Sequence, residues 1–256
     1  MHHLTKCSIF LEFFISDESM SPISIGTGFT IDYYNNEKYL ITNWHNVTGR
    51  NSETDKPLSS TGYTDPLYLK AHFLKKGKIN EWVQKKIFLT DEDSNKLYLE
   101  HPRGRDVDVV AVKIPVFDDV DIYNSFDAIY REQFNKQITD SCCIIGFPKG
   151  ISTAGKLPIW KSGNIASELE IDHDNRPLFL IDASTREGMS GSPVYCISKG
   201  QKTVGPTIIL GGTEAINFIG IYSGRIGNDI EIGRVFKASC LNEIFLYDLK
   251  KRNGML

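Results

Sequence analysis

Three residues that could together cleave an acyl bond lie far apart in this chain of 256 residues, each at an end of an apolar run. They are His45, Asp108 and Ser190. A serine hydroxyl is a weak nucleophile until a base takes its proton, and histidine suits that task because its pKa lies near neutrality. A carboxylate can then hold the imidazole in one tautomer. These residue types predict hydrolysis through an activated serine.

His45 follows an apolar run in the segment YLITNWHNVTG. The end of a strand holds a side chain firmly and leaves it accessible, which suits a catalytic base. On its own such a histidine is more often structural, so its role depends on the other two positions. None of the other five histidines directly follows such an apolar run. They are His2, His3, His72, His101 and His173.

Asp108 opens the apolar run of RDVDVVAVKI, where a strand would meet a loop. A partly buried carboxylate there could orient an imidazole and stabilise its charged form. Asp106 is the rival, because two residues along a strand share a face. We favour Asp108 because the apolar run begins directly after it. Either residue could instead be a solubilising charge at a strand edge.

Ser190 lies between Gly188 and Gly191 in TREGMSGSPVY. Glycines permit a sharp turn whose N–H groups point inward, so the amides of Gly188 and Ser190 could form an oxyanion hole. Ser192 is the rival nucleophile, but it lies on the strand side of the turn. The motif does not fit the G-x-S-x-G elbow of α/β-hydrolases.

The elements that must position these residues are short runs rich in Ile, Val, Phe and Tyr, separated by Gly, Asn, Asp and Pro. Such a pattern is typical of an all-β sandwich or barrel, and helical crossovers for a parallel sheet are missing. The expected strands are 6–15, 23–32, 38–42, 67–74, 82–89, 96–100, 109–114, 141–145, 157–167, 178–182, 193–197 and 218–222.

Two segments have helical spacing. Residues 125–135 form a weak candidate, and residues 236–249 place several apolar side chains on one face. We therefore divide the chain into an N-terminal β-barrel with the histidine and aspartate (1–118), a connector (119–137), a C-terminal β-barrel with the serine and substrate cleft (138–235), and a helix with its tail (236–256).

Composition limits the function. There are 29 basic and 32 acidic side chains, so the chain lacks the basic excess that phosphate binding requires, and we expect no nucleic-acid partner. Apolar runs are too short for a membrane span, and the N-terminus has no signal-peptide pattern, so we expect a cytoplasmic protein. The five cysteines lack the spacing of a zinc site, and we expect no metal or cofactor.

Taken together, ITNWHNV, DVVAVKI and GMSGSPV resemble the motifs of trypsin-like serine peptidases, in the HtrA-like bacterial branch. Their order along the chain also matches. The resemblance extends to IGFPKG at 145–150, similar to a segment beside the oxyanion loop, and to GIYSGR at 220–225, similar to a wall of the substrate cleft. It implies two six-stranded antiparallel Greek-key barrels of the chymotrypsin type, followed here by an α-helix, with no PDZ domain.

The resemblance also implies roles by position. His45 would be the general base, Asp108 its orienting partner and Ser190 the nucleophile, with oxyanion amides from Gly188 and Ser190. The backbone around Gly224, from Ser223 to Arg225, would pair with the substrate, and Ser184 would lie at the floor of the specificity pocket. Those substrate-binding residues are Ser184, Ser223, Gly224 and Arg225.

Some residues depart from the family pattern. Met189 stands where digestive relatives carry an aspartate that captures a new N-terminus, so activation by that route is not expected. Arg225 is large and cationic where many relatives have glycine, which would narrow the pocket or favour acidic side chains. Cys142 and Cys196 fall where secreted relatives form a disulfide, so they should be neighbours in space, and reduced in a cytoplasmic protein.

The resulting prediction is a serine endopeptidase that acts on polypeptides through an acyl-enzyme. The alternative is a catalytically silent pseudo-peptidase that binds peptides, and a third possibility is a β-rich interaction protein in which the motifs coincide by chance. The resemblance also implies a partner protein in a stress or defence system.

Overall fold

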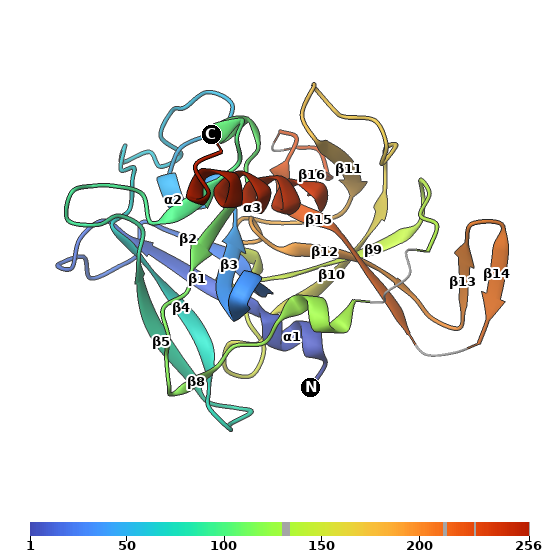
Figure 1. Ribbon diagram of the computed structural model, residues 1–256, viewed down its shortest axis with the longest axis horizontal. Coiled ribbons are helices and arrows are strands. Elements are labelled where there is room, and N and C mark those ends of the chain that lie inside the picture. Colours follow the sequence, from blue (N-terminus) through green and yellow to red (C-terminus); the bar gives the residue numbers. More distant parts are fainter. Residues whose placement is uncertain (130–133, 212–213, 228, 256) are drawn as a thin grey trace.

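The structure is a computed structural model that describes residues 1–129, 134–211, 214–227 and 229–255. Strands dominate it, and they gather into two main sheets placed side by side (Figure 1). The all-β prediction with a C-terminal helix is therefore confirmed. No helix in the described ranges has the length and apolar character needed to cross a bilayer.

The N-terminal sheet has the strand order β5-β4-β1-β2-β3-β7-β6, and β8 pairs with β4 beside this path. All of its pairings are antiparallel. Its strands are β1 (Ser8–Phe14), β2 (Ser24–Tyr33), β3 (Glu37–Thr42), β4 (Tyr68–Lys75), β5 (Trp82–Phe88), β6 (Tyr98–Glu100), β7 (Val110–Lys113) and β8 (Val120–Asp121).

This sheet curls without closing fully into the six-stranded barrel that the resemblance implies. Its two end strands, β5 and β6, meet only near their connecting turn. There Thr90 and Lys96 form an isolated bridge, and the Leu97 amide donates to the Leu89 carbonyl at 2.9 Å. Strand β6 is short because Pro102, which has no N–H to donate, follows soon after it.

The C-terminal sheet is a closed six-stranded barrel, as expected, with the order β10-β11-β16-β15-β12-β9. A separate two-stranded hairpin projects from it on one side (Figure 1). The barrel strands are β9 (Ser141–Gly146), β10 (Ile159–Ile165), β11 (Leu178–Asp182), β12 (Pro193–Ser198), β15 (Ala215–Arg225) and β16 (Ile232–Lys237), and the hairpin is β13 (Gln201–Val204) with β14 (Thr207–Leu210).

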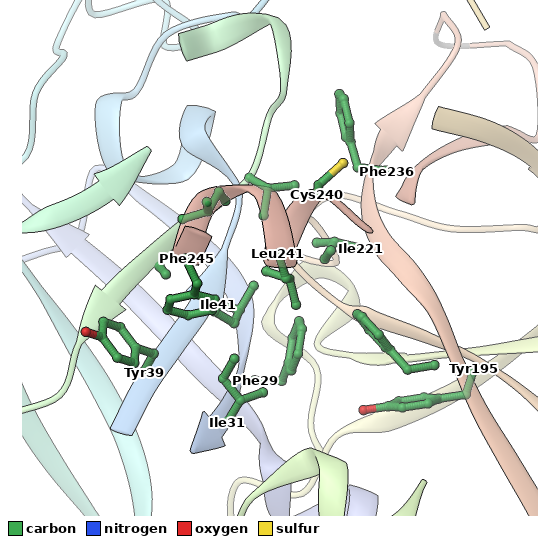
Figure 2. Packing of buried hydrophobic residues seen from close by; sticks show 14 of the residues in the cluster. Phe29, Ile31, Tyr39, Ile41, Tyr195, Ile221, Phe236, Cys240, Leu241 and Phe245 are labelled. Carbon is green, nitrogen blue, oxygen red and sulfur yellow. The ribbon is translucent and has the colours of Figure 1, made fainter. Parts of the chain in front are cut away.

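A shared core joins the two sheets beneath helix α3 (Ser239–Arg252). Figure 2 shows Phe29 and Ile41 of the N-terminal sheet, Tyr195 of the barrel, and Leu241 and Phe245 of α3 converging in this cluster. Each sheet also has its own buried cluster, built from alternate strand positions. Because apolar surface is buried on both sides of the junction, the two sheets are held at a defined separation.

Several element boundaries differ from the sequence predictions. Helix α3 begins at Ser239 instead of 236, because Phe236 is paired within β16, opposite Leu178 and Ile221. Strand β16, the short β8, and the hairpin strands β13 and β14 were not predicted.

The remaining short elements are helical turns. The predicted helix 125–135 is a single 3₁₀ turn, η3 (Ser125–Ala128), in its described part, and residues 130–133 lie outside the described residues. Helix α1 (His3–Cys7) occupies the start of the first predicted strand. Other turns are α2 (Trp44–Thr48), η1 (Tyr34–Asn36), η2 (Gly104–Asp106) and η4 (Pro148–Gly150). The division of the chain at 118, 137 and 235 stays a prediction.

Candidate active site

His45 lies on the short helix α2, which begins two residues after β3 ends. Gly49 ends this helix in a left-handed conformation (φ +67°), and its amide donates to the His45 carbonyl at 2.9 Å. The His45 side chain is 15% exposed. The sequence predicted a strand end, and the structure places the histidine in the first turn of the helix that follows the strand.

Asp108 accepts three hydrogen bonds although only 1% of the residue is exposed. Its Oδ2 lies 2.6 Å from His45 Nδ1 and also accepts from the Ser223 hydroxyl at 2.5 Å. Its Oδ1 accepts from the His45 backbone amide at 2.8 Å. An ionised carboxylate so placed keeps the proton on Nδ1 and leaves Nε2 of the ring free to act as a base.

The structure separates the two rival residues from this pair. Asp106 is exposed at the end of η2, whereas Asp108 is buried two residues before β7 begins. Ser192 is fully buried, and its hydroxyl has no hydrogen-bond partner among the described residues. Its hydroxyl lies close to Gly146, away from solvent, so a substrate could not reach it.

Ser190 is half-buried in a turn that depends on its flanking glycines. Gly188 has φ +87° and Gly191 has φ +88°, a region that other residues rarely adopt. A Cβ on Gly191 would lie 2.1 Å from the Thr27 carbonyl oxygen. The turn is therefore pressed against β2 of the N-terminal sheet, which brings Ser190 to the seam where His45 lies.

Two backbone amides near Ser190, those of Gly188 and Ser190, are the predicted oxyanion donors. The Glu187 carbonyl accepts from the Lys149 amide at 2.6 Å. In a trans peptide the N–H points opposite to the C=O, so the Gly188 N–H is directed away from Lys149. Neither this amide nor that of Ser190 donates to any acceptor in the described ranges. The segment 145–150 thus contacts the turn that carries Ser190, as the resemblance implied.

The predicted substrate-binding residues lie around the same seam, in a cluster of charges. Ser184 is exposed, and the hydroxyl of Ser223 is used by Asp108. Gly224 has φ +113°, where β15 bulges. The Arg225 guanidinium lies 3.7 Å from Glu231, and its carbonyl accepts from Arg234 at 3.0 Å. The charge of Arg225 is therefore partly compensated.

Sequence reasoning missed three polar side chains that hold the site together. Asn43 Nδ2 donates to the Asp108 carbonyl at 2.6 Å, and Asn46 Nδ2 donates to the Ser190 carbonyl at 3.0 Å. Thr27 Oγ1 donates to the Gly188 carbonyl at 2.8 Å. The available signal was the pair of asparagines flanking the histidine in NWHN, because buried amides need partners.

Cys142 and Cys196 are directly opposite each other on β9 and β12, as the resemblance implied, and both are free thiols. Burial raises the pKa of each thiol to about 12, so neither is a reactive thiolate near neutral pH. Across the ranges described here, His, Cys, Asp and Glu form no group that could hold a metal ion.

Comparison with known proteins agrees with this architecture. The family model described as a trypsin-like peptidase domain matches residues 26–205, most of the chain. The protein therefore belongs to the trypsin-like peptidase family. No curated protein sequence matches it significantly. The HtrA-like branch without a PDZ domain stays a prediction.

Solved structures of serine proteases share the fold at low sequence identity. The protease Rv3671c of M. tuberculosis, in its active form, has a TM-score of 0.52 and 14% identity, over 95% of this chain and 81% of that one. The protease Anisep of Arthrobacter nicotinovorans has a TM-score of 0.53 and 12% identity, over 94% of each chain. The thermostable serine protease AL20 from an extremophilic microorganism has a TM-score of 0.53 and 10% identity, over 95% of this chain and 97% of that one.

Proposed function

We propose that the protein is a serine endopeptidase in which Ser190 is the nucleophile, His45 the general base and Asp108 its orienting partner. The observation that carries this proposal is the environment of Asp108. A carboxylate with 1% exposure would be costly to bury, yet it accepts three hydrogen bonds, two of them from His45. This arrangement fixes both the tautomer and the direction of the imidazole.

In the proposed reaction, Ser190 Oγ attacks the carbonyl carbon of a peptide bond while His45 Nε2 takes the hydroxyl proton. Charge develops on the substrate oxygen, where the amides of Gly188 and Ser190 donate to it. The imidazolium, stabilised by Asp108, then gives its proton to the leaving amine. Water, activated by His45, hydrolyses the acyl-enzyme and restores Ser190.

The described residues include no hydrogen bond between the Ser190 hydroxyl and the His45 ring. Such bonds are often long in unliganded enzymes and shorten when substrate binds. Ser184, Ser223, Gly224 and Arg225 are the proposed substrate-binding residues. A polypeptide is the proposed substrate, and both the cytoplasmic location and the partner in a stress or defence system stay predictions.

Labelling by a fluorophosphonate tests the proposal, because the reagent phosphonylates only an activated serine. Wild-type protein should be labelled at Ser190, and Ser190→Ala and His45→Ala should lose labelling by a factor on the order of 10⁴ or more. Ser192→Ala is the matched control and should retain labelling. A folded wild-type protein that is not labelled would favour the pseudo-peptidase alternative, and labelling of Ser190→Ala would overturn the assignment of the nucleophile.

A further inference from the structure

Asn46, the residue directly after His45, connects both main sheets at the candidate site. The residue is 5% exposed. Its Nδ2 donates to Thr42 Oγ1 at 2.9 Å and to the Ser190 carbonyl at 3.0 Å. Thr42 is the last residue of β3, and Ser190 lies in the turn before β12. One amide group therefore contacts the strand that leads to the histidine and the turn that carries the serine.

The Ser190 carbonyl receives a second donor from the same sheet. The Thr27 backbone amide of β2 donates to it at 2.9 Å. A carbonyl oxygen has two lone pairs, so the two donors can bind together and define the direction of the peptide group after Ser190. That direction in turn sets where the Ser190 side chain leaves the backbone. Both donors come from the sheet that carries His45 and Asp108.

Gly26 provides the space that this amide occupies. A Cβ at Gly26 would lie 2.7 Å from Asn46 Nδ2 and 3.0 Å from its Cγ. The φ of Gly26 is not in the left-handed region, so the backbone conformation does not require glycine there. The absence of a side chain at Gly26 therefore makes room for the side chain of Asn46.

We propose that Asn46 is a positioning residue, which holds the Ser190 backbone so that its hydroxyl lies within reach of His45. This inference rests on the proposed function. The base and the nucleophile belong to different sheets, so small shifts between these sheets would separate them. A misplacement of about 1 Å can cost on the order of 10²-fold in rate. Asn46 is adjacent in sequence to the base and hydrogen-bonded to the nucleophile, so it opposes that shift directly.

The test compares fluorophosphonate labelling rates of wild type, Asn46→Leu and Asn46→Ser. Leucine keeps the approximate shape of the side chain but has no donor, and serine is smaller, so it removes the amide without adding bulk near Gly26. We expect the labelling rate and the kcat for a peptide to fall about 10- to 100-fold. The KM should change by no more than about twofold, because substrate binding does not use Asn46. The low-field proton resonance of His45 Nδ1 should remain, since the pair with Asp108 is intact.

Asn124→Leu is the matched control. Asn124 also makes side-chain hydrogen bonds, to Asp32, Phe126 and Asp127, but it caps the turn η3 and contacts none of His45, Asp108 and Ser190. Its loss measures what removing an asparagine costs in stability alone, and labelling should continue at the wild-type rate. Melting curves and circular dichroism restrict the comparison to folded protein.

Three outcomes separate the two proposals. Rapid labelling of wild type with slow labelling of both Asn46 variants supports the positioning role. Rapid labelling of wild type and of either folded Asn46 variant overturns that role and leaves the proposed function intact. Absence of labelling in folded wild type overturns the proposed function, and with it the positioning role of Asn46.

Discussion

The N-terminal sheet carries two imidazole–carboxylate pairs with the same separation and different surroundings. His45 Nδ1 lies 2.6 Å from Asp108, and His72 Nε2 lies 2.6 Å from Glu12. Both histidines are largely buried, with side chains 15% and 6% exposed. A contact distance alone therefore does not distinguish a candidate catalytic pair from a structural one.

The two pairs differ in which ring nitrogen is used and in what surrounds the carboxylate. His45 gives Nδ1 to its carboxylate, which leaves Nε2 without a hydrogen-bond partner among the described residues. His72 gives Nε2 to Glu12, and the Gln84 amide lies 3.3 Å from the same nitrogen. The ring of His72 also packs against Phe10, with 5.2 Å between centroids.

A second difference concerns the neighbouring nucleophile. The residue after His45 is hydrogen-bonded to the Ser190 carbonyl, whereas the hydrogen-bond partners of the His72 side chain are Glu12 of β1 and Gln84 of β5. The first pair lies at the seam between the two sheets, and the second lies within one sheet. The two pairs are therefore distinguished by their place in the fold, because the glycine-rich turn of the barrel contacts the residue beside His45.

Asp108→Asn should have the largest effect. The amide NH₂ of asparagine is a donor and would face groups that also donate to this position. Nδ1 of His45 would then have to accept, which leaves the ring proton on Nε2, where the base is needed. We expect the labelling rate to fall about 10⁴-fold, with little change in fold. Glu12→Gln is the matched change in the other pair and should leave the rate within about twofold of wild type. Equal losses in the two variants would remove the distinction between the pairs.

Gly191→Ala should have the next largest effect, because it displaces the turn that carries Ser190, beside the His45–Asp108 pair. Its Cβ would collide with the Thr27 carbonyl oxygen, and its φ of +88° disfavours any side chain. We expect a loss of about 2–4 kcal/mol in unfolding free energy and at least a 10²-fold fall in labelling rate.

Gly205→Ala is the control for backbone strain in this experiment. Gly205 also has a positive φ, +55°, but a Cβ there would meet nothing within 4 Å. Chemical denaturation should show a loss of about 1 kcal/mol, and labelling should be unaffected. If Gly191→Ala behaved like Gly205→Ala, the close contact between the turn and β2 would not be needed for reactivity.

Ser223→Ala tests the third donor to Asp108; Glu12 accepts from His72 and, at 3.3 Å, from the Gln84 amide. Removing it leaves both hydrogen bonds from His45 in place, so we expect only about a tenfold fall in labelling rate. Ser8→Ala is the control, since the Ser8 hydroxyl is buried and donates to the Ile145 carbonyl of the barrel, a bond between the two sheets that involves none of His45, Asp108 and Ser190. Ser223→Ala kinetics indistinguishable from those of Ser8→Ala would show that the third donor has no role in orienting the carboxylate.

Much of this arrangement could be predicted from local sequence. Alternating apolar residues identified most of the strands, because one face of each strand must be buried. The flanking glycines of Ser190 marked its turn, and the start of an apolar run separated Asp108 from Asp106. These signals are local, so the segments around His45, Asp108 and Ser190 could each be predicted without knowing how the sheets pack.

Features that depend on long-range contacts were missed. Strand β16 contains Gly233 and Arg234 and has little apolar alternation, but its ladder with β11 and β15 closes the barrel. The amide contact from Asn46 to Ser190 joins residues 144 positions apart, so no local pattern reveals it. The curled, incompletely closed N-terminal sheet likewise results from how β5 and β6 meet.

The smallest expected effect concerns His72 and the dependence of stability on pH. Burial lowers the pKa of His72 below its usual 6.5, with Glu12 opposing this change and Lys156 and Lys70 adding to it. The unfolded chain then binds a proton at a higher pH than the folded protein does. The neutral, buried His72 ring therefore favours the folded state. This contribution to the free energy of unfolding is complete above pH 6.5 and is lost as the pH falls below that value.

His72→Gln removes the titrating ring, so its melting temperature should fall less than that of wild type between pH 7 and pH 5, by about 2 °C or less. Its labelling rate at neutral pH should match that of wild type, because this pair does not contact the candidate site. Parallel melting curves for the two proteins would show that His72 does not titrate differently in the folded state. A fall in labelling would show instead that the two pairs are coupled through the sheet they share.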